Sequence, residues 1–474
     1  MKKTFYFLMF LLLSFAFVGC NGKDDRIVIR YANWNLGTPE SLDTNMERLM
    51  INEFMKKYPE IKIEIIERPK IPGTNDDMEW INFLTSRASI EALPDVFMAD
   101  NIPYYVINDW VYNLTDIAGA DEEFLNISAD IRSAITYDGK IMAVPCAVFY
   151  AGYIVNKTLY EDRYQNSPTV ESTFDELIQL TKAAADHAST NNTGVVGLDG
   201  IEHILHWYPA QLNDDYGWFT LTDEGFNLDS EEFRTTIEVY RGLQTDSTFV
   251  YDALIWESQQ TGSNIDLNVI FPEGDPFNNG NVLCKWFYSW DFGWIQTRIN
   301  NGEYTWEMDF IGTPVVNGNK RVPIVADFFV VASNTKHPEE AYLFAKWMGF
   351  GKDGYNKRLE LSNTVDGINQ VNFPPIQADE ELLDDYFSLY PEFTGLRTII
   401  EAGKVIVEPP KYLPGYDDAR YRGTYDAEHS MYQIIEKLRF GEVQIADIAE
   451  QLNARANALY QQVKSQFDDA IAQR

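Results

Sequence analysis

The sequence predicts an α/β protein with two or more domains. Near the start of the chain, a β-branched strand, an amphipathic helix and a second strand follow one another, as in α/β layers built on a largely parallel sheet. The chain has 474 residues, and single cores rarely grow beyond about 250 to 300 residues. Because 45% of the residues are hydrophobic, the chain can fill more than one core.

The opening unit occupies residues 27–65. Residues 27–31 are apolar and β-branched, which predicts a buried strand. Apolar side chains then recur at spacings of three and four, which predicts a helix that Pro59 ends. These side chains are Leu42, Met46, Leu49, Met50 and Phe54. Residues 61–65 alternate between apolar and polar side chains, as expected for the second strand.

Later segments repeat the alternation of strands and helices. Further strands are predicted at residues 95–99, 140–144 and 152–156. A helix follows Thr173, which forms a capping box with Glu176. Another helix begins at Pro338, and the acidic residues of its first turn suit the positive end of the helix dipole. The last predicted helix covers about residues 445–467, and its apolar side chains are interpreted as core.

The N-terminal residues have the pattern of a secretory signal. Two lysines precede an apolar run at residues 5–18 that is too short to remain as a membrane-spanning helix. The segment Phe17-Val18-Gly19-Cys20 resembles the lipobox of bacterial lipoproteins, in which the cysteine is acylated and becomes the first residue. The alternative is an ordinary secreted protein whose Cys20 lies within the removed peptide.

The signal pattern sets the first boundaries of the chain and its expected location. We expect residues 1–19 to form the signal peptide and residues 20–26 to form a lipid anchor and tether. The mature protein would then be exported and held by the lipid on Cys20 at the outer face of a bacterial membrane. No second apolar segment reaches the about 18 residues that a membrane span needs.

The charge of the chain excludes one class of partner. The formal net charge is −34, from 38 basic and 72 acidic residues. Such a surface repels the phosphate backbone of nucleic acids, so we expect no nucleic acid partner. Beyond Cys20, only Cys146 and Cys284 remain, too few for a disulfide scaffold, and separate buried thiols are favoured over a bridge.

Enzyme signatures are missing from the sequence. We find no nucleophile elbow, zinc-protease helix, paired-cysteine motif or phosphate-binding loop. His203 and His206 stand three apart and could bind a metal from a helix, but ordinary packing or ligand contact is favoured. We therefore expect no metal, no cofactor and no catalytic residues.

Aromatic residues placed near expected turns are the most informative feature for function. Flat apolar rings suit the C–H faces of sugars, and neighbouring polar groups can hold the hydroxyls. Equally, any one of these rings can be part of a core. The set comprises Trp34, Tyr104, Tyr105, Phe149, Tyr150, Trp207, Tyr208, Trp218, Trp286, Tyr288, Trp290 and Trp294.

Several segments, in their order along the chain, resemble the family 1 extracellular solute-binding proteins, the group that includes the maltose-binding protein. The most specific of them runs from Asp138-Gly139-Lys140 to Asn156-Lys157 and is similar to the family's first hinge crossing. The similar segments are residues 54–60, 93–101, 138–157, 277–290 and 336–341.

This resemblance implies a two-lobe fold of the periplasmic-binding-protein kind, with a hinge and a ligand cleft between the lobes. Lobe 1 would comprise residues 27–146 plus 315–350, and lobe 2 residues 147–314 plus 351–474. The crossings would lie near residues 145–150 and 314–327. The cleft positions carried over are Trp34, Asn35, Asp100, Asn101, Phe149, Trp207, Tyr208, Trp290 and Asp327. Phe149 stands where family members often have a charged residue.

The expected function is capture of a small polar ligand, a sugar or oligosaccharide, by a monomeric lipoprotein that delivers it to ABC permease subunits. Two alternatives stay open at this point. One is a secreted carbohydrate-active enzyme that uses paired carboxylates across a cleft. The other is a surface glycan-binding protein without a transporter.

Overall fold

The computed structural model describes residues 25–38, 44–74, 76–365, 371–377 and 379–474. The predicted signal peptide, Cys20 and Leu42 lie outside the described residues. In the described part of the chain, no helix combines the length and apolar composition that crossing a membrane requires.

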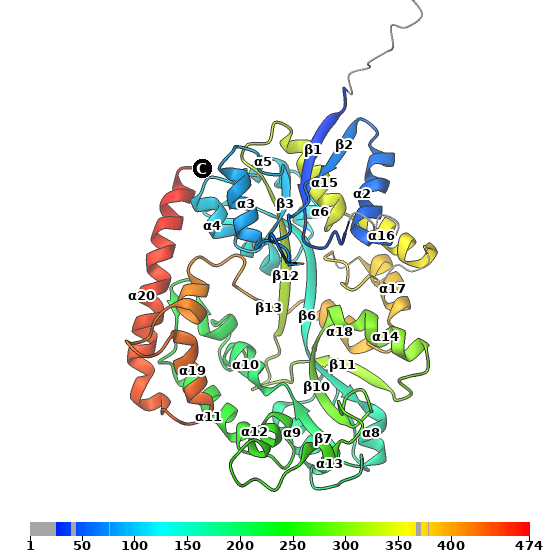
Figure 1. The fold of residues 1–474 in the computed structure, drawn as a ribbon, viewed down its shortest axis with the longest axis vertical. Helices are drawn as coiled ribbons and strands as arrows, with labels where there is room; N and C mark the ends of the chain where they lie inside the picture. The colour runs from blue at the N-terminus through cyan, green and yellow to red at the C-terminus, as the bar shows by residue number, and fades with distance from the viewer. Residues whose placement is uncertain (1–24, 39–43, 75, 366–370, 378) are drawn as a thin grey trace, which may run out of the picture.

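A mixed sheet, nine-stranded within the described residues, runs from one lobe into the other (Figure 1). The strand order is β2-β1-β3-β12-β6-β10-β7, with β11 beside β6 and β13 beside β12. Its strands are β1 (Ile27–Ala32), β2 (Ile61–Ile65), β3 (Val96–Ala99), β6 (Val144–Asn156), β7 (Val196–Asp199), β10 (Val282–Tyr288), β11 (Met308–Gly312), β12 (Val322–Val331) and β13 (Val405–Val407). Two short hairpins pair β4 (Thr136–Tyr137) with β5 (Lys140–Ile141) and β8 (Leu221–Thr222) with β9 (Gly225–Phe226).

The opening unit of the sheet confirms the predicted strand, helix and strand. β1 pairs in parallel with β2 from Ile27 opposite Ile61, and also in parallel with β3. The expectation of a largely parallel sheet is corrected, because β12 is antiparallel to both β3 and β6, and β6 is antiparallel to β10 and β11. Strands that carry the chain from one lobe to the other and back must run in opposite directions.

The longest strand, β6, joins the two lobes. Strands were expected at residues 140–144 and 152–156, but the segment from Val144 to Asn156 is a single strand of 13 residues. Its first half pairs with β12 and its second half with β10. Almost every side chain of β6 is buried, so the alternating pattern that marks a half-exposed strand is missing. The predicted crossings fall on β6 and on the start of β12, and β13 adds a third crossing beside them.

Lobe 1 holds helices on both faces of its part of the sheet (Figure 1). They are α2 (Met46–Lys57), α3 (Trp80–Ala88), α4 (Ile102–Ile107), α5 (Thr115–Ala118), α6 (Glu122–Leu125), α7 (Ala129–Ala134) and α15 (Pro338–Met348). Asn45 caps α2 by accepting a hydrogen bond from the Arg48 amide. The helix predicted to begin at Pro338 is α15, and its side chains Phe344, Trp347 and Met348 are buried.

Lobe 2 is built in the same way around β7, β10 and β11. Its helices are α8 (Lys157–Asp162), α9 (Phe174–Ala184), α10 (Ile204–Leu212), α11 (Glu231–Gln244), α12 (Tyr251–Ser258), α13 (Leu267–Ile270) and α14 (Phe292–Asn300), with the short turns η2 (Ile201–His203), η3 (Trp218–Thr220) and η4 (Ser289–Asp291). The capping box of Thr173 and Glu176 at the start of α9 is present as predicted.

The C-terminal quarter of the chain does not belong to one lobe. Its elements are α16 (Lys352–Thr364), α17 (Glu380–Leu389), α18 (Thr394–Ala402), the π-helical turn η5 (Asp418–Arg422), α19 (Met431–Arg439) and α20 (Ile445–Ala472). The structure corrects the assignment of all of residues 351–474 to lobe 2, because α16 packs against α2 and α15 of lobe 1.

The last helix, α20, lies along the side of both lobes (Figure 1). It packs against η5, β9 and α19, and also against α4 of lobe 1. Lys140 Nζ donates to the carbonyl of Ile471 at 2.6 Å, and Arg474 Nη2 donates to the carbonyl of Val106 at 2.7 Å. These contacts with lobe 1 extend the helix beyond its predicted end at residue 467.

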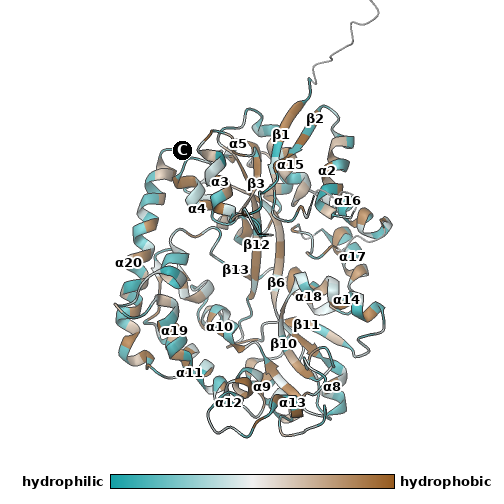
Figure 2. Cartoon of the chain, viewed as in Figure 1, coloured by the Kyte–Doolittle hydropathy of each residue, from teal (hydrophilic) through white to brown (hydrophobic). Residues whose placement is uncertain are grey.

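Hydrophobic side chains concentrate on the crossing strands, and the outer helices alternate between apolar and polar faces (Figure 2). Cys146 and Cys284 are both free thiols, as predicted, and Cys284 is buried whereas Cys146 is half-buried.

Candidate ligand-binding cleft

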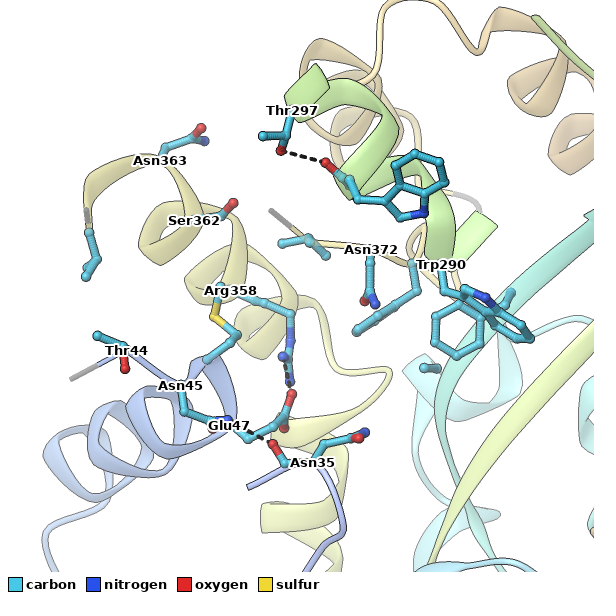
Figure 3. A pocket seen from close by; sticks show the side chains of 18 of the residues that line it. Asn35, Thr44, Asn45, Glu47, Trp290, Thr297, Arg358, Ser362, Asn363 and Asn372 are labelled. Atoms are coloured by element: carbon cyan, nitrogen blue, oxygen red, sulfur yellow. Dashed lines mark hydrogen bonds and ion pairs between the residues drawn. The ribbon is translucent and has the colours of Figure 1, made fainter. Parts of the chain in front are cut away.

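A cavity of about 1120 Å³ lies where the two lobes meet. Its floor comes from the crossing strands β6 and β12, one wall from the start of α2 and the end of α16, and the opposite wall from η4 and α14 (Figure 3). Residues 371–373 close one side. Of the predicted site residues, the structure brings Asn35, Phe149, Trp290 and Asp327 together in this lining.

The wall from lobe 2 carries two aromatic side chains, Trp290 and Trp294, beside polar residues of α14. Trp290 lies in η4, and its indole stacks on the ring of Tyr288 at 4.1 Å with an interplanar angle of 8°. The rings of Phe149 and Trp290 form a T-shaped pair with centroids 5.3 Å apart. Trp290 is 37% exposed, and it lines the cavity. A large exposed ring held in place by two others is a rigid platform for an apolar ligand face.

Backbone and side-chain hydrogen bonds fix this wall. The amide of Tyr150 in β6 donates to Ser289 Oγ at 3.0 Å, which ties η4 to the crossing strand. In α14, Trp294 Nε1 donates to Asp291 Oδ1 at 3.1 Å. Trp294 and Thr297 of α14 line the same cavity as Trp290.

The wall from lobe 1 is polar. The loop after β1 carries Asn33 and Asn35, and the Asn35 amide donates to Asn33 Oδ1 at 2.7 Å. Asn45 Nδ2 donates to the carbonyl of Asn35 at 2.9 Å, so the loop is fastened to the start of α2. Amide groups offer both donors and acceptors, which suits the hydroxyl groups of a neutral polar ligand.

A buried ion pair lies beneath the polar wall. Arg358 of α16 donates from Nη1 and Nη2 to the two carboxylate oxygens of Glu47 at 2.5 and 3.2 Å, and Nη2 also donates to the carbonyl of Met348 at 3.1 Å. Figure 3 shows the guanidinium pointing at Glu47. Burial opposes the charge of Arg358, but the Glu47 carboxylate outweighs this effect and raises the pKa of Arg358.

A second ion pair lies on the floor. Lys411, which follows the third crossing, donates to Asp327 Oδ1 of β12 and to the carbonyl of Ala326. Cys146 lies on the same floor, and burial, together with the Asp327 and Glu47 carboxylates, raises the pKa of its thiol well above the usual value. The thiol is therefore protonated at neutral pH and is a poor nucleophile.

Asp100 and Asn101 follow β3 but are not among the described residues that line this cavity. Asp100 accepts a hydrogen bond from the Tyr105 hydroxyl, and burial raises the pKa of its carboxyl group. Asn101 caps α4 by accepting from the Tyr104 amide at 3.0 Å. The polar role of Asn101 is thus structural in this conformation.

The remaining predicted residues are packed rather than presented to the cavity. The structure places Trp207 in the core of lobe 2, where it is fully buried beside Phe174 and Tyr208. Tyr208 is itself almost completely buried. Trp34 packs against Trp80 in a T-shaped arrangement, with ring centroids 5.2 Å apart. The rings of Trp207 and Tyr208 on α10 both point into the core of lobe 2. The spacing of these residues in the sequence does not show this orientation.

Several lining residues were missed by the sequence reasoning. Glu47, Arg358, Asn372 and Phe373 come from the start of α2 and from segments more than 300 residues later. None lies in a local motif, because the site forms only when α16 packs on α2. Trp294 belonged to the aromatic set, and its spacing of four from Trp290 was the one available signal.

The sequence model of the bacterial extracellular solute-binding proteins matches residues 38–350, about two thirds of the chain. The chain belongs to this family. Its members are named as extracellular binding proteins, which agrees with an exported protein. A search of curated proteins finds no match in sequence.

Solved structures share the fold of this solute-binding protein. The ABC substrate-binding protein from Listeria monocytogenes in complex with cycloalternan is 17% identical, with a TM-score of 0.61 over 92% of this chain and 99% of its own. A sugar transporter protein from Rhizobium etli in an open conformation is 14% identical, with a TM-score of 0.66 over 91% and 99%. The sugar-binding protein MalE from Xanthomonas citri is 14% identical, with a TM-score of 0.63 over 93% and 99%. These likenesses show the two-lobe fold.

Proposed function

We propose that this solute-binding protein captures a sugar or oligosaccharide between its lobes, closes on it, and delivers it as a monomer to the permease subunits of an ABC importer. The observation that carries the proposal is the partly exposed indole of Trp290, which stacks on Tyr288 and lines the same cavity as Asn33, Asn35 and Asn45. A flat ring opposite hydrogen-bonding groups matches the apolar face and hydroxyl edge of a pyranose. The sugars named for the neighbouring structures point in the same direction.

A thermal-shift screen of the purified protein against mono- and oligosaccharides tests this function. A ligand that binds only the folded state stabilises it by RT ln(1 + [L]/Kd), about 2.7 kcal/mol at a hundredfold excess over Kd. A positive shift without release of reducing ends or smaller sugars supports binding. Sustained turnover of the bound sugar would instead indicate a carbohydrate-active enzyme.

We propose that the protein is anchored through a lipid on Cys20. The Cys20→Ala variant should then appear in the soluble fraction after cell disruption, because the acidic surface repels anionic headgroups and no other anchor is expected. Fractionation and metabolic labelling with a fatty acid measure this directly. A variant that stays with the membrane would contradict the anchor.

Ligand binding should close the lobes about the crossing strands β6, β12 and β13. These strands carry the chain between the lobes, so a rotation there changes the cleft without disturbing either core. We expect small-angle scattering to show a smaller radius of gyration with the ligand found in the screen. An unchanged radius at saturating ligand would rule out closure.

A further inference from the structure

A second indole, that of Trp294, lines the cavity one helical turn beyond Trp290. The two side chains are 39% and 37% exposed, respectively. The turn η4 leads directly into α14, so the two positions have the spacing of four that places side chains on the same side of a helix. Their separation along the helix is about 6 Å, which is comparable with the length of one pyranose unit in a linear glycan.

Trp294 is held in place by neighbours within lobe 2. Its Nε1 atom donates to Asp291 Oδ1 at 3.1 Å. Its ring centre lies 6.2 Å from that of Phe287, 6.3 Å from that of Tyr304 and 6.4 Å from that of Phe277. None of these three rings is among the described residues that line the cavity. Trp294 is therefore positioned before a ligand arrives, and it keeps exposed surface for a contact that the protein does not make.

The cavity extends along α14 from its floor. Trp290 contacts the floor, since its ring pairs with that of Phe149 in β6, and Thr297 lines the cavity one turn beyond Trp294. Figure 3 shows Thr297 well apart from Asn35, the lining residue on the loop after β1. The volume of about 1120 Å³ exceeds the roughly 300 to 1,000 Å³ of most sites for drug-sized ligands, and a single hexose is smaller than such a ligand. The cavity therefore has room for more than one sugar unit.

Hydrogen-bonding groups line the cavity together with the second indole. The guanidinium carbon of Arg298 lies 5.8 Å from the centre of the Trp294 ring. Asn363, at the end of α16, and Asn372 also line the cavity, and neither side-chain amide is hydrogen-bonded to another described residue. Such amides can both donate to and accept from sugar hydroxyls.

The charges that line the cavity are neutralised by partners within the protein. Every charged side chain among the described lining residues forms an ion pair, so a charged ligand meets no unpaired counter-charge there. The formal net charge of −34 also opposes the approach of an anion. The pairs are Arg298 with Glu303, Arg358 with Glu47, and Asp327 with Lys411.

We propose that the transported solute is a neutral oligosaccharide of at least two sugar units, and that Trp294 sets this preference by stacking on the unit next to the one that Trp290 holds. This inference rests on the proposed sugar-binding function and narrows its substrate class. Both rings belong to lobe 2 and to one continuous helical segment. Closure of the lobes therefore leaves their spacing unchanged.

Isothermal titration of the purified protein with sugars of increasing length tests the inference. The probes are glucose, galactose and mannose, their α- and β-1,4-linked di- and trisaccharides, and uronate forms of the same disaccharides. We expect a neutral disaccharide to bind about ten times or more tighter than both its monosaccharide and its uronate form, because it covers two indoles and brings no unpaired charge. A monosaccharide that binds as tightly as its disaccharide, or a uronate that binds more tightly, would overturn the inference and leave the sugar-binding function intact. Failure of every sugar probe to bind the folded protein would overturn both.

Variants of the two tryptophans show which ring holds which unit. Trp294→Ala should weaken the disaccharide roughly ten- to a hundredfold and the monosaccharide far less, whereas Trp290→Ala should weaken both. Trp294→Phe keeps a ring and should retain part of the gain with length. Trp256→Ala is the matched control, because Trp256 is also 39% exposed but stacks on Phe440 and does not line the cavity.

The control should leave every affinity unchanged, and the melting temperature of ligand-free Trp294→Ala should change little. Equal losses for monosaccharide and disaccharide in folded Trp294→Ala would show that this ring does not hold a second unit.

Discussion

Replacing Glu47 with alanine is expected to destabilise the folded protein by about 3 to 5 kcal/mol. The carboxylate is the charged partner of Arg358, whose side chain is only 5% exposed. Without it, the guanidinium keeps one hydrogen bond, to the carbonyl of Met348, and stays charged in a buried position. Chemical denaturation followed by circular dichroism measures the change.

A double substitution controls for the loss of the pair itself. Replacing Glu47 with glutamine and Arg358 with methionine removes both charges, so most of the stability should return. An unchanged unfolding midpoint in Glu47→Ala would mean that water reaches Arg358. The ion pair would then not be a buried support for the polar wall. The affinity for ligand should also fall in Glu47→Ala, because this pair joins α2 to α16 at the cavity.

Replacing Trp290 with alanine is expected to weaken ligand binding by about 1 to 3 kcal/mol, or roughly ten- to a hundredfold. The ring presents exposed surface to the cavity, so its removal takes away a stacking platform without opening a large void. Titration with the sugar found in the thermal-shift screen measures the affinity. The melting temperature of the ligand-free variant should change little.

Trp207→Ala provides the matched control for Trp290. This tryptophan is fully buried in lobe 2, and truncating such a ring costs about 3 to 5 kcal/mol of folding stability. The two variants should therefore show opposite patterns, one losing affinity and the other losing stability. A folded Trp290→Ala protein with unchanged affinity would remove this residue from the site and weaken the case for a sugar.

The parts of the fold that depend on local patterns could be predicted from the sequence. The first strand, the helix α2 and the second strand follow from spacing, and the start of α9 follows from a capping box. The single strand β6 could not be found, because its central residues are buried on both faces and show no alternation. Its continuity depends on pairing with β12, nearly 180 residues away.

The candidate site was harder to predict for the same reason. Trp207 and Trp290 are the same residue type, so the sequence alone does not separate their roles. The orientation of α10 and η4 in the fold places Trp207 in the core and Trp290 at the cavity. Arg358 and Glu47 are separated by 311 residues, so no local motif joins them. Family resemblance supplied Asn35, Phe149, Trp290 and Asp327, and the other lining residues depend on long-range packing.

The position of α20 has a consequence for how the protein folds. The end of this helix is bound to lobe 1 through Lys140 and Val106, across sequence separations of 331 and 368 residues. Phe467 and Ile471 also belong to the core cluster that contains β1 and β3. Lobe 1 therefore cannot complete its core until the last residues of the chain have emerged. Since contacts this distant in sequence form slowly, we expect the docking of α20 to be a late step in folding, after the sheet of lobe 2 has formed.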